Sequence, residues 1–304
     1  MADLILHHFA ASPFSEMVRL VLGYKQLAWT SVTVPNILPK PDVVALTGGY
    51  RRTPFLQIGA DVYCDSALIC DVLEQLQPTP SLYPAPTQAL ARIVAQWADS
   101  SLFWAAVTYN RGASGELPAA VFEDRKAMGF DVEWLRPADA TAAYKSYLQR
   151  LADLLQQHPF LLGTSPCIAD FSAYHPLWLA HGRGPTPLAL PMHLPALTHW
   201  MQQMRAIGHG NSVPVTAAQA IAIAAGAEPA AAGKNLLAAD SWQDEHGIAL
   251  GSRVTIAAES FGRELTEGEL IAATTSHYSL RRTDERAGSI HVHFPRVGYV
   301  LKRS

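Results

Sequence analysis

Cysteine is scarce in this 304-residue chain: only Cys64, Cys70 and Cys167 are present, and no C-x-x-C pair occurs. An odd, sparse and widely spaced set argues against a disulfide framework and indicates a reducing compartment. Charge is scarce as well, since charged residues make up 16% of the chain and the formal net charge is −3. Such a composition gives no sign of a nucleic-acid-binding scaffold.

Long apolar runs and metal-ligand spacings are also missing. No apolar run approaches the length that spans a bilayer, and the first residues lack the basic stretch and apolar run of a signal peptide. The histidines include His291 and His293 on one face of an expected strand, but three or four ligands at defined spacing do not occur. We therefore expect a cytoplasmic protein without a membrane segment, a nucleic-acid partner or a metal site.

Three regions of the chain differ in their pattern. Residues 1–78 alternate strand-like and helix-like segments, residues 86–210 keep helical spacing, and residues 211–304 change from an Ala-rich helix to short β-like runs. With 49% hydrophobic residues, the chain is long enough for two or three cores. We therefore predict three domains with these bounds, the last of them a helix followed by an antiparallel β module.

The first region centres on Ser12. A short buried strand at 4–6 and a loop lead to it, and the apolar residues that follow recur at the spacing of one helix face: Phe14, Met17, Val18, Val21 and Leu22. Ser12 therefore occupies the N-cap position and Pro13 the first helical position, which needs no N–H. This arrangement holds a hydroxyl over a helix N-terminus, where unpaired N–H groups and the helix dipole favour an anion.

The other segments of the first region predict a thioredoxin-like unit. Strands are expected at 29–34, 55–58 and 62–64, and helices at 42–46 and 66–76. The resulting order is strand-helix-strand-helix-strand-strand-helix, with a proline opening the third strand. This is the thioredoxin arrangement.

Together, four motifs resemble the glutathione S-transferase superfamily. They are Ser12-Pro13-Phe14-Ser15 with Val18-Arg19-Leu20, Thr53-Pro54 before a strand, Asp65-Ser66 opening a helix, and a capping motif at 163–170. Their order is more specific than any one of them, and they cover roughly the first two-thirds of the chain. The resemblance implies an α/β thioredoxin-like N-terminal domain and an all-α glutathione-transferase-like helical domain. The small β-rich C-terminal domain has no counterpart in an ordinary member.

Ser12 is the catalytic residue that this resemblance implies. Its hydroxyl would donate a hydrogen bond to the glutathione thiolate, the nucleophile whose pKa a helix N-terminus lowers. Alternatively, Ser12 only caps the helix, which stabilises the helix by about 1 kcal/mol. Ser15 lies one turn inside the helix and is the less suitable hydrogen-bond donor to the thiolate. Because both serines replace the cysteines of a C-x-x-C motif, disulfide exchange through this motif is excluded. A tyrosine-dependent site is also disfavoured, since His7 and His8 stand where that tyrosine would be.

The same resemblance implies the other glutathione contacts. Thr53-Pro54 would be a cis peptide whose backbone N–H and C=O pair with the cysteinyl part like an added strand; the alternative is an ordinary trans proline. Ser66 would bind the γ-glutamyl carboxylate and Asp65 its ammonium group, roles that are compatible with capping a helix. Arg52 or Arg51 would meet the glycine carboxylate, and the alternative is a solvated loop charge.

We therefore hypothesise a glutathione transferase that uses glutathione as co-substrate and attacks a hydrophobic electrophile. The resemblance also implies a homodimer, the usual assembly of the family. Trp104, Tyr109, Tyr174 and Trp178 are candidate pocket aromatics, although core packing is the commoner role of such residues. The competing hypothesis is a non-catalytic protein-interaction or regulatory module, because a fold does not define a function. The added C-terminal region is long enough to cover a pocket or recruit a partner.

Overall fold

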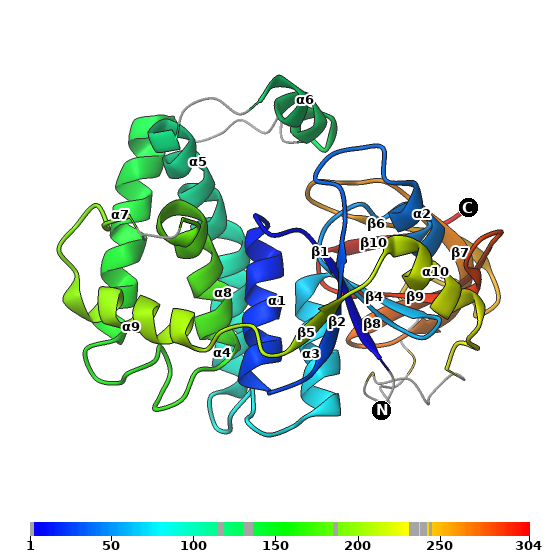
Figure 1. Ribbon diagram of the computed structural model, residues 1–304, viewed down its shortest axis with the longest axis horizontal. Helices are drawn as coiled ribbons and strands as arrows, with labels where there is room; N and C mark the ends of the chain where they lie inside the picture. Colours follow the sequence, from blue (N-terminus) through cyan, green and yellow to red (C-terminus); the bar gives the residue numbers. More distant parts are fainter. Residues whose placement is uncertain are drawn as a thin grey trace.

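Figure 1 shows a group of helices beside a large sheet, with helix α1 (Pro13–Tyr24) between them. The computed structural model describes residues 3–304 except for 115–117, 130–135, 185–187, 231–236, 238–241 and 243–244. The strands are β1 (Leu4–His8), β2 (Trp29–Thr33), β3 (Phe55–Ile58), β4 (Asp61–Cys64), β5 (Ser212–Pro214), β6 (Arg253–Ala258), β7 (Thr266–Ala273), β8 (His277–Asp284), β9 (Gly288–Pro295) and β10 (Tyr299–Arg303).

The first four strands and three helices form the thioredoxin-like unit in the predicted order. Strand β1 pairs in parallel with β2 and antiparallel with β3, which pairs antiparallel with β4. The helices of this unit are α1, α2 (Pro41–Thr47) and α3 (Ser66–Leu76). Helix α1 begins as the sequence predicts, because Ser12 caps it and Pro13 is its first residue.

The regular elements of the second region are helices in its described residues, as predicted, with one isolated β-bridge between Phe160 and Gly163 in the loop before Ile168. The region contains α4 (Gln88–Trp97), a π-helical stretch (Ala98–Leu102), α5 (Phe103–Ser114), α6 (Ala119–Ala127), α7 (Pro137–Leu154), α8 (Ile168–Leu177) with a second π-helical stretch (Trp178–Gly182), and α9 (Pro195–Ala206). The buried carboxylate of Asp170 stabilises this region, since it accepts hydrogen bonds from Leu161 N at 2.8 Å, Cys167 N at 3.0 Å and Trp200 Nε1 at 2.9 Å. The predicted capping motif is therefore present, with Leu161 N and Cys167 N as the backbone donors to Asp170.

The third region extends the sheet of the first. The sheet order is β10-β6-β7-β8-β9-β4-β3-β1-β2-β5, and β9 pairs in parallel with β4. Strand β5 adds to the opposite edge beside β2, and helix α10 (Ala217–Ala225) follows it. The edge of β4 is thus covered by the protein's own C-terminal strands, which removes an unpaired edge.

A buried polar chain crosses this new strand junction. His293 Nε2 lies 2.9 Å from Asp61 Oδ1, and Ser279 Oγ lies 2.7 Å from His293 Nδ1. The three side chains come from β4, β8 and β9, so they tie the first region to the third within the sheet. Because buried polar groups need such partners, this chain favours one register between β4 and β9.

The predicted antiparallel β module is present as strands β6 to β10, which pair antiparallel with one another. The β-like run expected over 270–282 is two strands, β7 and β8. They are separated by a turn in which Thr274 Oγ1 accepts hydrogen bonds from Ser276 N at 3.3 Å and His277 N at 3.1 Å. The domain bounds at 78, 86, 210 and 211 stay predictions.

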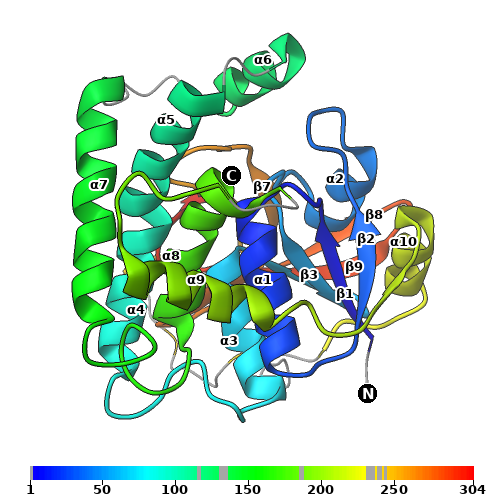
Figure 2. The same cartoon turned by 60° about the vertical axis from the view of Figure 1, so that its left-hand side comes forward.

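The two faces of the sheet pack into two separate hydrophobic clusters. One cluster joins Leu4, Leu6 and Leu56 to α1, α3 and the helical region. The other joins strands of the first region to α10 and to the C-terminal strands, for example through Val62, Val254 and Ile290. Figure 2 shows α2 and α10 together on the side of the sheet away from the helical region. The C-terminal strands therefore share a core with the first region.

Helix α4 turns an apolar side to the surface. Ala91 and Ala95 are its buried residues, whereas Leu90 is 49% exposed and Ile93 is 64% exposed. The alanines allow the close approach of α8, with which α4 packs. Among the described residues, the helices are all too short or too polar to cross a membrane.

Candidate functional site

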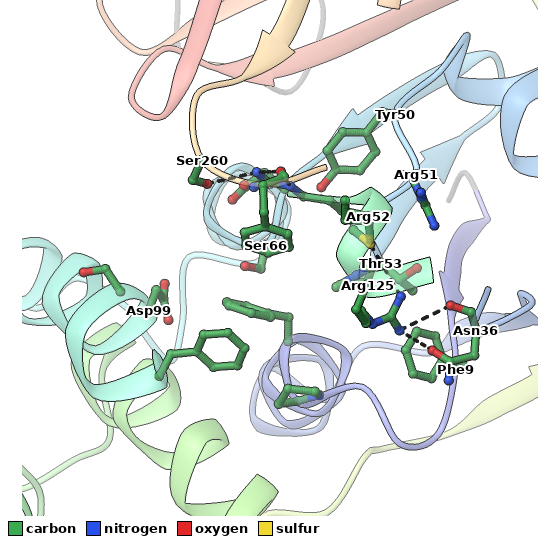
Figure 3. A pocket seen from close by; sticks show the side chains of 18 of the residues that line it. Phe9, Asn36, Tyr50, Arg51, Arg52, Thr53, Ser66, Asp99, Arg125 and Ser260 are labelled. Carbon is green, nitrogen blue, oxygen red and sulfur yellow. Dashed lines mark hydrogen bonds between the residues drawn. The ribbon is translucent and has the colours of Figure 1, made fainter. Parts of the chain in front are cut away.

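A pocket of about 330 Å³ lies where the three regions meet (Figure 3). Its walls come from the start of α1, the segment before β3, the start of α3, the junction of α4 and α5, the end of α6, and the loop between β6 and β7. The residues that line it include Pro13, Phe14, Lys40, Arg51, Arg52, Thr53, Pro54, Asp65, Ser66, Asp99, Ser100, Phe103, Trp104, Arg125, Met128, Ser260 and Phe261.

Ser12 lies directly behind the pocket wall. Its Oγ accepts a hydrogen bond from Ser15 N at 3.2 Å and lies 3.5 Å from Thr53 O. The residue is only 4% exposed, and its neighbours Pro13 and Phe14 line the pocket instead. Ser15 is fully buried, and its hydroxyl has no hydrogen-bond partner among the described residues. The N-cap role is therefore confirmed, and the catalytic role of Ser12 stays a prediction.

Arg19 holds the loop that positions Ser12. Its guanidinium donates hydrogen bonds to Phe9 O at 3.3 Å and Ala10 O at 3.0 Å, and it pairs with Glu16 at 2.6 Å. His8 Nδ1 lies 3.0 Å from Arg19 Nη1. Burial and the adjacent Arg19 charge lower the pKa of His8 from 6.5 to about 4, so its neutral ring accepts this bond near neutral pH.

Thr53, Pro54, Asp65 and Ser66 come together in the pocket, as the sequence predicts. The Thr53–Pro54 peptide is cis, which confirms that expectation. Asp65 is the N-cap of α3, and its Oδ1 accepts a hydrogen bond from Ala67 N at 3.0 Å. Its Oδ2 accepts a second hydrogen bond from the Tyr299 hydroxyl at 3.0 Å. Burial raises the pKa of Asp65 above its usual value, while its hydrogen bonds and Arg52 oppose that rise.

Arg52 lines the pocket but is also held by the C-terminal region. Its Nε donates to Phe261 O at 2.8 Å, and its Nη2 donates to Ser260 Oγ at 3.0 Å. The guanidinium carbon lies 4.1 Å from the centre of the Phe261 ring. In Figure 3 the Arg52 side chain reaches from the segment before Thr53 toward Ser260 and Ser66.

The end of the pocket away from Ser66 carries three cations, Lys40, Arg51 and Arg125. Sequence reasoning missed Lys40 and Arg125. Lys40 Nζ donates to Arg51 O at 3.2 Å, and Arg125 Nη2 donates to Asn36 O at 3.3 Å. Arg51 pairs with Asp124 and with Glu264, the latter at 2.9 Å. Burial and the charges of Arg125 and Arg51 lower the pKa of Lys40 from 10.5 to about 8. Lys40 and Arg125 belong to no motif, so nothing in the sequence places them here.

Asp99 is a further pocket residue that sequence reasoning missed. It lies in the π-helical stretch between α4 and α5, and its Oδ1 is 2.8 Å from Nε2 of the fully buried His175. Figure 3 shows Asp99 on the side of the pocket where Ser66 lies, opposite Arg125 and Asn36. A π-helical interruption, which is frequent at functional sites, was the only local feature that could have drawn attention to it.

One wall of the pocket is a row of aromatic rings. The ring centres of Phe14 and Phe103 are 4.8 Å apart, those of Phe103 and Trp104 are 4.9 Å apart, and those of Trp104 and Phe261 are 5.3 Å apart. Of the four candidate aromatics from the sequence, Trp104 lines this pocket, whereas Tyr109, Tyr174 and Trp178 do not. Tyr174 and Trp178 belong to the hydrophobic core, and Tyr109 packs against it.

Metal chemistry has no support in the described part of the chain, where no group of three or more histidine, cysteine, aspartate or glutamate side chains could hold a metal ion. The three cysteines, which all lie in described segments, are free and buried. Burial raises the pKa of Cys64 and Cys70 well above their usual value, so neither thiol is an activated nucleophile.

Comparisons with known proteins agree with this architecture. A family profile described as the N-terminal domain of glutathione S-transferase matches residues 6–81. A solved GST-like protein from Pseudomonas syringae is 38% identical, with a TM-score of 0.83 and 100% of both chains covered. A theta-class glutathione S-transferase from Xanthomonas axonopodis pv. citri, solved with glutathione bound, shares the fold at 23% identity and a TM-score of 0.51. That match covers 67% of this chain and 92% of the other.

Two curated relatives match part of the chain. FtsZ-localized protein A of Caulobacter vibrioides is 28% identical over 176 residues, which are 55% of this chain and 73% of that protein. Pyrimidodiazepine synthase of Drosophila melanogaster is 33% identical over 83 residues, which are 26% of this chain and 34% of that protein. The fold, the family profile and the full-length likeness to the Pseudomonas protein lead to one conclusion: this chain belongs to the glutathione S-transferase superfamily and carries a β-rich C-terminal region in addition.

Proposed function

We propose that the protein is a glutathione transferase that activates the glutathione thiol for attack on an electrophilic small molecule. The observation that carries this proposal is the order of polar groups along the pocket. Cations lie at both ends, Asp65 and Asp99 line the end where Ser66 lies, and the start of α1 lies between the two ends. Glutathione has a carboxylate at each end, an ammonium group beside one of them, and a thiol in the middle.

The γ-glutamyl end fits the start of α3. Ser66 and the first N–H groups of α3 favour a carboxylate, because a helix N-terminus carries unpaired N–H groups and partial positive charge. Arg52 adds a full positive charge near Asp65, the residue before Ser66, since its charge opposes the rise in the Asp65 pKa. Asp65 and Asp99 line the same end and provide carboxylates for the ammonium group.

The glycine end fits the opposite cations. Lys40 and Arg125 line that end of the pocket. Arg51 pairs with two carboxylates, Asp124 and Glu264, whereas Arg125 pairs with one, Asp124, at 2.8 Å. We therefore assign the glycine carboxylate to Lys40 and Arg125. Arg52, which the sequence suggested together with Arg51, lies instead close enough to Asp65 for its charge to act on the pKa of that carboxyl.

The thiol belongs at the start of α1, with the cysteinyl backbone against Thr53. The Ser12 hydroxyl contacts Thr53 O at 3.5 Å, a long distance for an O–H···O bond. Its hydrogen is therefore available to turn toward a sulfur. A thiolate held there donates its electron pair to an electrophilic carbon, and a C–S bond forms. In a substitution the carbon–leaving group bond breaks, the leaving group departs with its electron pair, and the thiol proton has gone to solvent.

Calorimetric titration of the full chain with glutathione tests this assignment. We expect a Kd of about 1 mM or lower, the usual range for enzyme substrates. The analogue with alanine in place of cysteine should also bind, because both ends of the tripeptide are recognised. Ser66→Ala should weaken binding, whereas Ser100→Ala should not, since Ser100 Oγ donates to Gln96 O at 2.7 Å within its own helix. Absence of binding heat with the unmodified chain would refute the proposal.

A protein-interaction module is the second candidate function. It is favoured by the likeness to a relative named FtsZ-localized protein A and by the position of Ser12 behind the pocket wall. Glutathione binding without turnover of any electrophile in a broad panel would support this candidate. Co-sedimentation with polymerised FtsZ is its direct test.

A homodimer is the proposed assembly. The apolar side of α4 supports it, since Leu90 is 49% and Ile93 is 64% exposed. Light scattering after size exclusion should give twice the mass of one chain. Ile93→Glu should shift the population to monomer. Val297→Glu should not, although the Val297 side chain is similarly exposed, at 68%. A cytoplasmic location, expected from the sparse cysteines, stays a prediction.

A further inference from the structure

The loop between β6 and β7, residues 259–264, links the C-terminal region to the pocket. Its members Ser260 and Phe261 line the pocket together with residues of the first and second regions. Figure 3 shows this loop reaching the pocket beside Arg52, at the end where Ser66 lies. The C-terminal region therefore contributes side chains to the same cavity as Thr53 and Pro54.

The loop is anchored on both sides of the cavity. Arg52 binds Phe261 O and Ser260 Oγ, and Arg51 pairs with Glu264 at 2.9 Å, so the first region holds two points of the loop. From the helical side, Met128 O accepts a hydrogen bond from Gly262 N at 2.7 Å. These contacts fix the backbone of the loop over the pocket.

Gly262 is suited to this close approach. Its φ is +59°, a conformation that L-residues with a side chain rarely adopt. A Cβ at this position would lie 3.1 Å from Met128 Cε and 3.3 Å from Arg52 Cγ. The loop sequence is therefore adapted to lie against both pocket walls.

The ring of Phe261 extends the aromatic wall of the helical region. Phe14, Phe103, Trp104 and Phe261 follow one another at centre distances of 4.8, 4.9 and 5.3 Å. This row begins at the start of α1, where the thiol is assigned, and ends in the C-terminal loop. A compound that contacts the row lies next to the sulfur.

We propose that the 259–264 loop forms the outer wall of the electrophile subsite and that this subsite selects flat, electron-poor aromatic compounds through Phe261. The inference rests on the proposed function, because it places the electrophile beside glutathione in the same pocket. Electron-poor rings make favourable stacked and edge-to-face contacts with phenylalanine and tryptophan. The Arg52 guanidinium lies over one face of the Phe261 ring, 4.1 Å from its centre, so the compound would meet the rest of that ring. A saturated electrophile gains only burial from the same wall. The C-terminal region is in this view a specificity element of the transferase site.

Binding and turnover of two electrophiles test the role of Phe261. Dinitrobenzene, which cannot react by losing chloride, serves as the binding probe, and chlorodinitrobenzene and iodoethane serve as the aromatic and aliphatic substrates. In Phe261→Ala we expect affinity for dinitrobenzene and kcat/KM for chlorodinitrobenzene to fall about tenfold, the upper range for one aromatic contact. The kcat/KM for iodoethane and the Kd for glutathione should change less than about twofold.

Leu265→Ala is the matched control, because Leu265 follows the same loop, is 60% exposed and does not line the pocket. It should leave all four measurements unchanged. Phe261→Leu keeps an apolar side chain without a ring, and it should lower the chlorodinitrobenzene rate while preserving the iodoethane rate. Thermal unfolding of each variant reports whether the loop change has affected the fold.

The outcomes separate this inference from the proposed function. If dinitrobenzene fails to bind the unmodified chain, or binds the Phe261→Ala variant equally well, the subsite assignment is wrong even when glutathione binds. If glutathione fails to bind while dinitrobenzene binds in a Phe261-dependent way, the aromatic subsite stands and the transferase proposal fails. An equal loss for aromatic and aliphatic substrates would also overturn the aromatic selectivity.

Discussion

The polar and aromatic halves of the pocket are built in different ways. Thr53, Pro54 and the Asp65-Ser66 pair line the polar half, and Ser12 lies behind its wall. All of them come from one continuous thioredoxin-like unit and belong to recognisable motifs. The aromatic half takes Phe14 from α1, Phe103 and Trp104 from α5, and Phe261 from the loop after β6. Local rules of capping and turn geometry govern the first half, whereas only the packing of distant elements assembles the second.

This difference has a consequence for specificity. A site for a common co-substrate gains from short motifs, because caps and strand edges recreate the same geometry wherever they occur. A site for a variable substrate gains from walls on separate elements, since each wall changes without disturbing the others. We therefore expect changes in the polar half to affect all electrophiles equally and changes in the aromatic half to affect electrophiles selectively.

The largest effect is expected at Ser12. Ser12→Ala should lower kcat for every electrophile by about 100-fold, the cost of losing one hydrogen bond to a developing or stabilised anion. Ser15→Ala is the matched control, because the Ser15 hydroxyl is buried without a described partner and its removal should not lower activity. Steady-state kinetics with an aromatic and an aliphatic electrophile measure both variants. A loss of kcat for only one of the two electrophiles would contradict the expectation that the polar half acts on all electrophiles equally.

Lys40 should make the polar half sensitive to pH. Its pKa is about 8 in the free protein, so its positive charge, and with it glutathione affinity, should be lost as the pH rises through 8. We expect a loss of up to about tenfold per pH unit above that value, the limit for one titrating group. Calorimetry across this range should show the loss in the unmodified chain and a weaker, flatter dependence in Lys40→Met.

The titration of Lys40 should also affect folding stability, but with the opposite sign: affinity for glutathione falls as the pH rises, whereas stability increases. Because the folded-state pKa lies below the unfolded value of 10.5, the unfolded chain binds more protons between pH 8 and 10.5. The free energy of unfolding should therefore gain on the order of 3 kcal/mol from this group as the pH rises through that window. Chemical denaturation measures this effect as the unfolding free energy of the unmodified chain minus that of Lys40→Met. This difference should rise between pH 8 and 10.5, and a constant or falling difference would contradict the assignment.

Gly262→Ala should act mainly on the aromatic half. The positive φ and the contacts with Met128 and Arg52 predict a loss of about 1 kcal/mol or more in unfolding free energy. Displacement of the loop should then lower kcat/KM for chlorodinitrobenzene several-fold more than for iodoethane, in line with a lost aromatic contact. Gly298→Ala, also at a positive φ of 88° but with no atom within 4 Å of the added Cβ, controls for backbone strain alone.

The smallest effect is expected at Phe103. Phe103→Leu keeps an apolar side chain but removes one ring from the row, so the preference for aromatic over aliphatic electrophiles should fall about threefold. The ratio of the two kcat/KM values is the measurement, because it cancels changes in enzyme concentration. An unchanged ratio here, together with a changed ratio in Phe261→Ala, would place the selectivity in the C-terminal loop alone.

Particular elements show how far sequence reasoning reached. The cap at Ser12, the cis bond before Pro54 and the start of α3 at Asp65 followed from residue types at fixed spacing, and the structure has all three. The C-terminal strands are also antiparallel, as the sequence predicts. The pairing of β9 with β4 is not predicted, since a parallel partner far along the chain leaves no local pattern.

The residues missed in the site have the same cause. Lys40, Asp99 and Arg125 look like ordinary surface residues in the sequence, and only the meeting of the start of α2, the α4–α5 junction and α6 brings them into one pocket. The exposed side of α4 shows a further limit. Contact with α8 buries Ala91 and Ala95 and leaves Leu90 and Ile93 exposed, and helical spacing alone does not tell which side of the helix meets a neighbour.

The sequence alone determined the thioredoxin-like unit, its capped first helix and the family to which the chain is similar, because these depend on interactions between residues close together along the chain. Tertiary structure decided that the C-terminal strands extend the same sheet and that Phe261 reaches the pocket. These arrangements depend on hydrogen bonds and apolar contacts between segments that are distant in sequence. Their free energy comes from mutual burial, and no single segment encodes it.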